Sequence, residues 1–339
     1  MSVNRNILVA LIFIWSVLAA AAGAENCNRT RAAFDVGSGA TKMVVAKIDI
    51  CQQLIVSVLL RQARKVAYND ALASNQQGQL PQSIVDRGIN ALLELKVLAV
   101  DVGATEFVGV ATSAFRRATN GSLVVKQILK RSGILVKIIS QRQEAILGYL
   151  AVESRFELPG PFSGRKLVVW DIGGGSMQIT ARDTNNFLVY QGKLASVSFK
   201  RQVIRDILGM DLMRVKSPNP IGARGEQGIT LAQKSAKQSV PKELKQILTS
   251  GAQVVGIGGV HYYSVRNRVA PQQSYYRRKQ LYLAAMAGMK LSDQQLDSAY
   301  AATEVTNLML VVGYMLGLNI DRVDVMKVNM ADGVLLRRD

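Results

Sequence analysis

The chain has 339 residues, of which 49% are hydrophobic and 19% are charged, with only 7 prolines. This composition is typical of a globular protein and excludes disordered and collagen-like chains, and the length favours two domains. One histidine and two cysteines exclude a Cys/His zinc site and a disulfide-rich scaffold, and a formal net charge of +18 indicates anionic partners.

The N-terminal segment, residues 1–24, has the pattern of a secretory signal peptide. Arg5 precedes the apolar run 7–18, and the small residues at 22–24 form a cleavage site. The apolar run is shorter than the roughly 20 residues that span a bilayer, which favours cleavage over an uncleaved anchor. We therefore expect an exported protein, periplasmic or secreted after cleavage near Ala24, without a membrane span in the mature chain.

The first half of the mature chain alternates strands and helices. Hydrophobic patterning predicts strands over residues 31–36, 41–50, 54–60, 106–111 and 134–139. It predicts helices over 81–100, 122–131 and 142–155, the second of which ends at Gly133. Prolines and glycines over 158–164 indicate a linker.

The second half restarts the same order. Strands are predicted over 167–172, 177–181, 187–190, 253–257 and 324–328, with helices between 197 and 246 and a largely helical tail. Two α/β units that each open with a glycine-rich hairpin turn predict a duplicated architecture with a cleft between the halves. We expect domain I over 25–150 and domain II over 165–339, with the C-terminal helix either in domain II or packed back on domain I.

Three glycine-rich turns are the candidate phosphate sites. Glycine lets the backbone approach a ligand closely, and successive N–H groups in such turns bind anions. One such turn also suits an ordinary hairpin, but matching turns in two repeats favour phosphate binding. The predicted phosphate-binding residues are Asp35, Gly37, Ser38, Gly39, Gly173, Gly174, Gly175, Ser176, Gly258 and Gly259. Asp171, at a strand end, is placed to hold a metal ion against a bound phosphate.

The two cysteines are predicted to form a disulfide. The first hairpin turns around Gly39, so the positions of facing residues should add up to about 78, as those of Cys27 and Cys51 do. Facing residues lie within disulfide range, and the expected export leads to a compartment where disulfides persist.

Several segments together resemble one known family. Residues 32–38 (AAFDVGS), 110–120 (VATSAFRRATN), 138–145 (IISQRQEA) and 168–176 (VVWDIGGGS) are similar, in this order, to motifs of the exopolyphosphatase and guanosine-pentaphosphate phosphohydrolase family, Ppx/GppA. The tail 331–336 resembles the closing helix of that family. The resemblance implies a duplicated actin-like ATPase (ribonuclease H-like) fold of the α/β class, with two domains and an interdomain cleft.

The resemblance also implies roles for individual residues. Glu144 stands at the position of the catalytic acid that orients and deprotonates the attacking water, and Arg116 at that of a phosphate-facing arginine. Asp171, together with Glu144, stands where the family holds Mg²⁺. The implied ligand is inorganic polyphosphate or a related polyanion, with no specific nucleic acid expected and a homodimer left open. Glu144 also begins a predicted helix, where an acid is stabilising without any catalytic role.

The sequence departs from the family pattern at several positions. At two positions where the family has an acid, this chain has the amides Gln143 and Gln178. At a third such position it has the basic residue Lys327. Other departures are Gly39, Ala40, Ile146, Met177, Val260, Met326 and Ala331. The leading interpretation is an exported phosphoanhydride hydrolase that releases terminal phosphate. The alternatives are a catalytically weak or inactive polyanion-binding protein on the same fold and a kinase of the same superfamily.

A basic segment lies in the second half. Residues 200–279 hold 15 Lys and Arg but only 4 Asp and Glu. Such a segment is usually a solvated surface, and its functional alternative is a funnel that attracts a polyanion.

Overall fold

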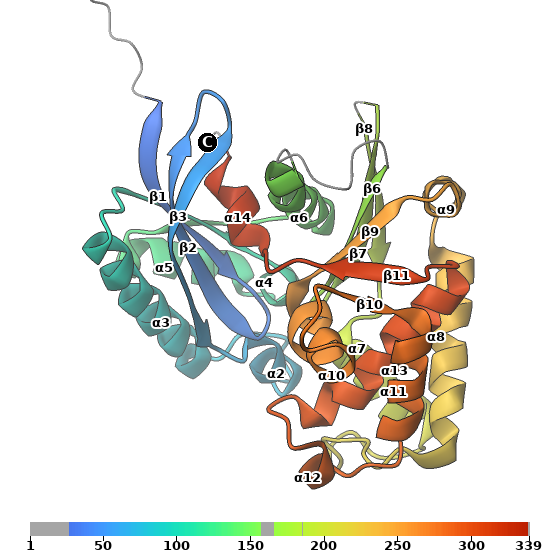
Figure 1. The fold of residues 1–339 in the computed structure, drawn as a ribbon. Coiled ribbons are helices and arrows are strands. Elements are labelled where there is room, and N and C mark those ends of the chain that lie inside the picture. Colours follow the sequence, from blue (N-terminus) through green and yellow to red (C-terminus); the bar gives the residue numbers. More distant parts are fainter. Residues whose placement is uncertain (1–26, 157–165, 185, 338–339) are drawn as a thin grey trace, which may run out of the picture.

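The protein folds into two mixed α/β lobes that lie side by side (Figure 1). A computed structural model describes residues 27–156, 166–184 and 186–337. The predicted signal peptide, 1–24, and the predicted linker, 158–164, lie outside these described residues. Each lobe is built on one sheet with helices against it, which confirms the predicted duplicated actin-like fold.

The first sheet has the strand order β3-β2-β1-β4-β5. Its strands are β1 (Asn28–Val36), β2 (Ala40–Asp49), β3 (Leu54–Lys65), β4 (Glu106–Ala111) and β5 (Leu135–Ile138). Helices α3 (Gln82–Asp101) and α5 (Gly121–Ser132) cover one face through an apolar core. Gly133, with φ of 68°, ends α5 in the left-handed conformation that glycine adopts at low cost.

The second sheet has the order β10-β11-β9-β6-β7-β8. Its strands are β6 (Leu167–Ile172), β7 (Met177–Asp183), β8 (Asn186–Gly192), β9 (Gln253–Ile257), β10 (Tyr275–Arg277) and β11 (Arg322–Val325). The order β8-β7-β6-β9-β11 repeats that of the first sheet, with the same antiparallel and parallel pairings. The two halves are therefore copies of one topology.

The remaining helices are α2 (Tyr68–Ala73), α4 (Ser113–Arg117), α6 (Gln141–Phe156), α7 (Ser196–Gln202), α8 (Gly225–Ser239), α9 (Lys242–Thr249), α10 (Asn267–Val269), α11 (Arg278–Gly288), α12 (Asp293–Leu296), α13 (Ala301–Gly317) and α14 (Met330–Leu335). Among them, α2 and α4 belong to the first lobe, α6 and α14 lie between the lobes, and the others cover the second sheet. Two π-helical segments, Val203–Ile207 and Val260–Arg266, and one 3₁₀ turn, Gly222–Arg224, complete the chain order. No helix in the described residues is both long and apolar enough to cross a bilayer.

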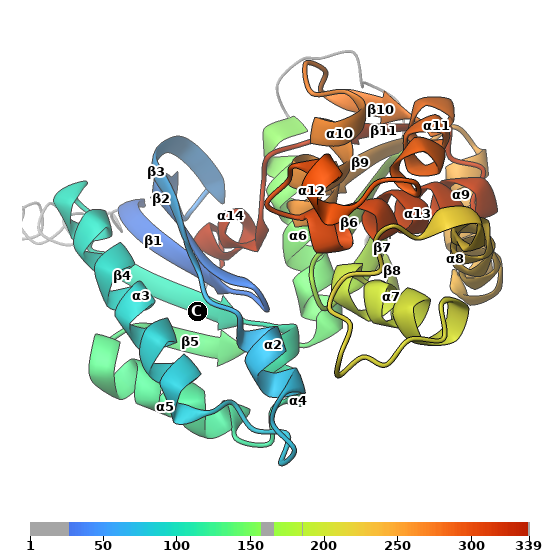
Figure 2. The same cartoon turned by 90° about the horizontal axis from the view of Figure 1, so that it is seen from below.

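Helix α6 lies between the two sheets, where it contacts both lobes (Figures 1 and 2). Its Leu147 belongs to the apolar cluster on the first sheet, whereas Tyr149 and Val152 pack against the second. The C-terminal helix α14 returns to the first lobe, where Arg31 donates hydrogen bonds to the carbonyls of Leu335 and Arg337, both at 2.8 Å. The first lobe is thus completed by the last residues of the chain.

The predicted bounds of the last strand are wrong. We predicted 324–328, whereas β11 covers Arg322–Val325, and the chain then leaves the sheet. Met326 and Val328 are apolar because they pack in a cluster with α6 residues, not because they continue the strand. Helices α2 and α4 and strand β10 were not predicted, since each is shorter than the window in which periodicity is visible.

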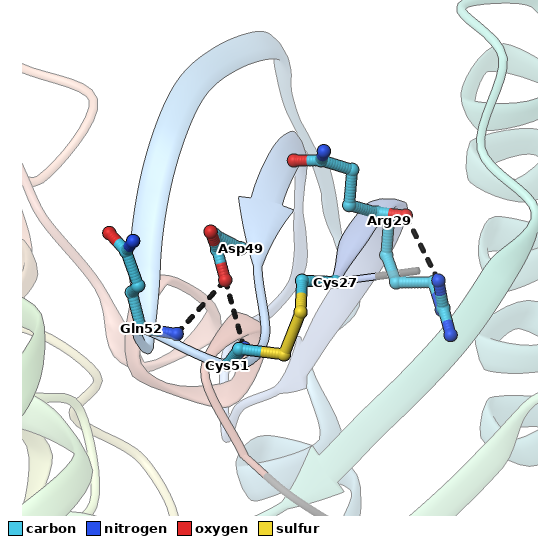
Figure 3. The surroundings of a disulfide bond; sticks show 6 residues. Cys27, Arg29, Asp49, Cys51 and Gln52 are labelled. Atoms are coloured by element: carbon cyan, nitrogen blue, oxygen red, sulfur yellow. Dashed lines mark hydrogen bonds between the residues drawn. A yellow bond between two sulfur atoms is a disulfide. The ribbon is translucent and has the colours of Figure 1, made fainter. Parts of the chain in front are cut away.

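The predicted disulfide joins Cys27 and Cys51 at the open end of the first hairpin (Figure 3). Their Cα atoms are 5.4 Å apart. The ladder register differs from the predicted one, because Asn28 faces Asp49 and the facing positions add up to 77. Cys51 therefore lies one residue beyond the position opposite Cys27, in a turn whose Cys51 and Gln52 amides both donate to Asp49 Oδ1 at 2.9 Å. The bond still fixes the start of β1 to the end of β2.

Candidate active site

The first two glycine turns have the same backbone design. In each, the amide of the first glycine donates to the carbonyl three residues later, from Gly37 to Ala40 at 3.0 Å and from Gly173 to Ser176 at 2.9 Å. Both turns follow a buried strand whose last residue but one is an aspartate, and both lead into the neighbouring antiparallel strand. The shared design places two equivalent loops at corresponding ends of the two sheets.

A short helix begins beside each loop. The Asn69 amide of α2 donates to the Ser38 carbonyl at 2.9 Å, and the Val197 amide of α7 donates to the Gly174 carbonyl at 3.0 Å. These two carbonyls occupy the same place in the two repeats. Helices α2 and α7 are therefore fixed to the loops (Figure 2).

The two loops contact each other at Gly175. Its carbonyl accepts a hydrogen bond from Ser113 Oγ at 3.1 Å. A Cβ atom at this position would lie 2.9 Å from both Ser38 Oγ and Ser113 Oγ, closer than a methyl group tolerates. Gly39, at the same place in the first loop, has no atom within 4 Å of such a Cβ. The approach of the two lobes thus depends on glycine in the second loop only.

The third glycine turn directly follows β9 and lies against the end of β6. Gly258 has φ of +85°, and a Cβ there would collide with Asp171 Oδ1 and lie 2.7 Å from the Ile172 carbonyl. Its neighbour Gly259 has open space instead. The structure therefore requires glycine at 258, which packs directly on the strand end that carries Asp171.

Glu144 joins the two lobes at the centre of the site. It lies in the first turn of α6 and is buried, with 3% of its surface exposed. Ser176 Oγ of the second loop donates to Glu144 Oε1 at 2.8 Å, and Arg116 Nη2 lies 2.7 Å from Glu144 Oε2. Burial raises the pKa of Glu144, while Arg116 and the Ser176 hydrogen bond oppose the rise. Three residues predicted from separate motifs therefore meet here.

Arg116 is held in place from its other side. It stands at the end of α4, and its Nη1 donates to the Ile139 carbonyl at 2.9 Å. The guanidinium therefore spans a fixed carbonyl and the Glu144 carboxylate. This arrangement leaves one planar cation beside the loops, in the fork geometry that suits phosphate oxygens.

Asp35 and Lys42 form an ion pair that sequence reasoning missed. Lys42 Nζ donates to Asp35 Oδ2 at 3.2 Å, and the two residues face each other across the β1–β2 ladder. The Asp35 carboxylate raises the pKa of Lys42, burial opposes this, and Asp171 adds to the rise. Asp35 Oδ1 is buried and has no hydrogen-bond partner. One oxygen of Asp35 is thus free to accept a ligand.

Asp171 has a different neighbour. It faces Gln178 across the β6–β7 ladder, at the place that Lys42 occupies opposite Asp35. Burial raises the pKa of Asp171 to about 7, Glu144 and Asp35 add to the rise, and Lys42 opposes it. Gln178 is buried, and neither its amide oxygen nor its amide nitrogen has a partner. The second aspartate is therefore close to other acids, without the cross-strand cation that the first one has.

The oxygen atoms of this site fit a hard divalent cation such as Mg²⁺. Mg²⁺ binds one or two carboxylates and completes its shell with water and phosphate oxygens. Asp35 Oδ1 and Glu144 Oε2 are both buried without a hydrogen-bond partner, although Glu144 Oε2 lies 2.7 Å from Arg116 Nη2. Asp171 is a buried carboxylate near both of these acids. Within the described residues, the one trio at mutual ligand distance is Cys27, Asp49 and Cys51, and its sulfurs form the disulfide.

The model of the Ppx/GppA phosphatase family matches residues 44–206. A putative exopolyphosphatase of Haemophilus influenzae is 33% identical over 181 residues, which cover 52% of each chain. Exopolyphosphatase 1 of Mycobacterium leprae is 29% identical over 108 residues, 32% of this chain and 31% of that protein. The matched part thus spans about half or less of the length of these curated relatives.

Solved structures agree on the fold. The Aquifex aeolicus member of the Ppx/GppA family superposes with a TM-score of 0.69 at 19% sequence identity, over 91% of this chain and 97% of that one. An exopolyphosphatase from Cytophaga hutchinsonii gives a TM-score of 0.68 at 16% identity, over 91% and 96%. The matched region includes the second loop, Arg116 and Glu144. Residues 44–206, just under half of the chain, thus match the Ppx/GppA phosphatase family, and the related sequences point to the same family.

Proposed function

We propose that the protein is an exopolyphosphatase-like hydrolase that releases the terminal phosphate of inorganic polyphosphate. The main observation behind this proposal is the position of Glu144, a buried carboxylate that contacts both Ser176 of the second loop and Arg116. Support also comes from the curated relatives, two of which are named as exopolyphosphatases. Hydrolysis of a phosphoanhydride needs positioning, charge neutralisation and a water-orienting base, and the site provides residues for each task.

The Arg116–Glu144 contact suggests how substrate starts the reaction. The terminal phosphate would bind Arg116 and the loop amides, because its oxygens match the guanidinium better than a single carboxylate oxygen does. Glu144 Oε2 would then lose its cationic partner and become free to accept a proton from water. Burial raises the pKa of Glu144 and so makes it a stronger base than an exposed glutamate.

The two aspartates on the strands that lead into the loops have a separate task. Asp35 and Asp171 would hold Mg²⁺, which when bound neutralises negative charge on the phosphate oxygens. Lys42 would balance Asp35 and keep the excess of acids from repelling the substrate. Ser176 would keep Glu144 oriented toward the attacking water.

We also propose that the protein acts outside the cytoplasm. The N-terminal pattern supports export, and the Cys27–Cys51 disulfide supports it independently, because disulfides persist in oxidising compartments. A reporter enzyme that is active only after export, fused behind residues 1–30, tests this. Reporter activity lost on changing the apolar run is the expected result, and activity without that run would contradict it.

Phosphate release from a defined polyphosphate by the purified protein, with and without Mg²⁺, tests the activity. Parallel assays with nucleoside triphosphates separate a hydrolase of inorganic chains from a nucleotide hydrolase or kinase. Mg²⁺-dependent release of single phosphates from chain ends is the expected outcome. No release under any condition would reject hydrolysis.

A second function, non-catalytic binding of a polyanion, is favoured by one observation. Gln178, which replaces a family acid, lies buried beside Asp171 without a hydrogen-bond partner. An amide there weakens cation binding and lowers repulsion toward a polyanion. Tight polyphosphate binding without phosphate release would support this second function.

A further inference from the structure

The C-terminal helix α14 carries a buried acid that lies outside the candidate active site. Asp332 is in the first turn of α14, and none of its surface is exposed. Arg61 of β3 donates two hydrogen bonds to it, from Nη1 to Asp332 Oδ2 at 3.0 Å and from Nη2 to Oδ1. The Asn329 amide also donates to Oδ2, at 2.9 Å. Asp332 therefore fixes the start of α14 to the first sheet.

The end of α14 is fixed to the same sheet by a second arginine. Arg31 of β1 is buried and donates to the carbonyls of Leu335 and Arg337. Its Nε donates to Glu106 Oε2 at 2.7 Å, so a carboxylate balances its charge. Two arginines from two strands thus hold this six-residue helix at both of its ends, although it follows a strand of the other lobe.

Helix α14 packs directly on α6, the helix that carries Glu144 (Figures 1 and 2). A Cβ atom on Gly333 would collide with the carbonyl of Leu147, so the two helices approach at a point where only glycine fits. Leu147 follows Glu144 by about one helical turn. Contact with α14 therefore limits the position of the turn that carries Glu144.

The other side of α6 meets the second lobe. A Cβ atom on Gly148 would lie 3.8 Å from Asp171 Oδ2 and 3.1 Å from Ile257 Cδ1. Adjacent residues of α6 thus contact α14 and the strand end that carries Asp171. Helix α6 is confined between them, and a shift of α14 would release it from one side.

The chemistry of the Arg61–Asp332 pair points to positioning rather than to stability alone. Burying an ion pair is costly because both charges lose water, and an apolar pair of similar volume is often as stable. Two parallel hydrogen bonds between a guanidinium and a carboxylate fix both the distance and the angle between their elements. The pair therefore specifies where α14 lies against the sheet, which apolar packing does less precisely.

We propose that Arg61 and Asp332 are positioning residues for Glu144. They act through α14, whose Gly333 holds α6 one turn after Glu144, and not by contact with the substrate. This inference rests on the proposed function, because the group that is positioned is the base proposed there. It assigns the last helix of the chain a part in turnover.

The test is Asp332→Asn, which keeps the size of the side chain and an oxygen for the Asn329 amide but removes the charge that Arg61 binds. The kcat for polyphosphate should fall by about ten- to a hundredfold, because a misplacement of about 1 Å costs up to that much. KM and polyphosphate affinity should change little, since the glycine loops stay in place. Arg61→Gln, at a partly exposed side chain, should act in the same direction and serves if Asp332→Asn does not fold. An unchanged kcat in these variants would overturn the proposal.

A double-variant cycle with Glu144→Gln separates positioning from a general loss of structure. If Asp332 acts through Glu144, adding Asp332→Asn to Glu144→Gln should lower kcat only slightly, because the group that it positions is already lost. A further loss of about tenfold or more would show that Asp332 acts elsewhere, and would overturn the proposal. Arg61→Lys keeps the charge and should recover part of the kcat that Arg61→Gln loses.

Glu304→Gln is the matched control. Glu304 is also a buried acid in the first turn of a helix, α13, and it lies 3.3 Å from Arg268 Nε in the second lobe. Its variant should lower the free energy of unfolding, as Asp332→Asn does, and leave kcat near that of the wild type. Equal losses of kcat in the two variants would mean that turnover follows stability, which contradicts positioning.

Amide hydrogen exchange tests the positioning of α6 without turnover. Exchange around Leu147 should be faster in Asp332→Asn than in the wild type and unchanged in Glu304→Gln. Unchanged exchange in Asp332→Asn would overturn the inference, whether or not the protein hydrolyses polyphosphate. A wild type that releases no phosphate but shows the expected exchange would reject the hydrolase and still support the control of α6 by Asp332.

Discussion

The two halves of the chain build the same loop on the same hairpin and surround it with different side chains. In the first half, Asp35 faces Lys42, and the loop ends in Ala40. In the second half, Asp171 faces Gln178, and the loop ends in Ser176. The backbone hydrogen bonds of the two loops match. The duplication therefore preserves the backbone of the loop, whereas the side chains around it differ between the two halves.

The difference decides which of the two loops contacts Glu144, the proposed base. Ser176 has a hydroxyl that reaches Glu144, whereas Ala40 at the same place has none. Lys42 neutralises Asp35, whereas burial and nearby acids raise the pKa of Asp171 to about 7. The aspartate of the first half is thus balanced by a cation, whereas the second half contacts Glu144, the proposed base, and carries the aspartate that would gain more from a bound cation.

The largest effect is expected from Glu144→Gln. If Glu144 accepts a proton from the attacking water, turnover of polyphosphate should fall by about 10²–10⁴-fold, the usual size of a general-base contribution. Binding should change little, because the amide keeps the size of the side chain. Steady-state phosphate release and competition binding measure the two effects.

Glu153→Gln is the matched control for this variant. Glu153 lies on the same helix and pairs with Arg182 at 2.9 Å, away from the loops. Its loss should leave turnover near that of the wild type. Equal turnover in Glu144→Gln and wild type would remove Glu144 from the mechanism.

The disulfide belongs to the first half and should have the next largest effect. It closes a sequence separation of 24 residues, for which the chain-entropy treatment gives about 3 kcal/mol of unfolding free energy. The double variant Cys27→Ala/Cys51→Ala should lose about that amount in urea unfolding. Wild type with reductant present is the control, and it should unfold like the variant. A loss below about 1 kcal/mol would show that the bond barely stabilises the first sheet.

The strands and glycine turns were predictable because they carry strong local signals. Buried strands such as β4 and β6 have the predicted bounds, and Gly133 ends α5 as expected. The fold class followed from the repeated order of these elements. Motif resemblance placed Arg116, Glu144 and Ser176 in one site, although they are far apart along the chain.

The partner of Asp35 could not be predicted, because one residue of register decides it. The predicted sum of 78 places Met43 opposite Asp35, whereas the observed sum of 77 places Lys42 there. A shift by one residue exchanges the two faces of a strand, so Lys42 was missed although the hairpin was right. Contacts such as that of Ser113 with Gly175 depend on how the two lobes meet, and no local pattern encodes that.

A matched glycine pair tests whether the lobes meet through the second loop. Gly175→Ala should lower the free energy of unfolding by about 1–2 kcal/mol, because the new methyl group displaces the Ser38 and Ser113 hydroxyls and weakens a hydrogen bond. Gly39→Ala, at the same place in the first loop, has open space and should change it by less than about 0.5 kcal/mol. Urea unfolding of both variants measures the difference. Equal effects would mean that the loops do not approach as the structure places them.

The smallest effect is expected from restoring an acid beside Asp171. Gln178→Glu adds a carboxylate at a buried position whose amide has no partner, so it should strengthen Mg²⁺ binding by roughly threefold, since cation affinity rises with the number of charged ligands. Gln143→Glu restores the other family acid at an exposed position on α6, so it should change Mg²⁺ affinity less. Calorimetric titration with Mg²⁺ alone measures both variants without requiring turnover. If Gln178→Glu binds Mg²⁺ no better than Gln143→Glu, the cation lies nearer Asp35 than Asp171, and the metal belongs to the first loop while Ser176 of the second loop orients Glu144.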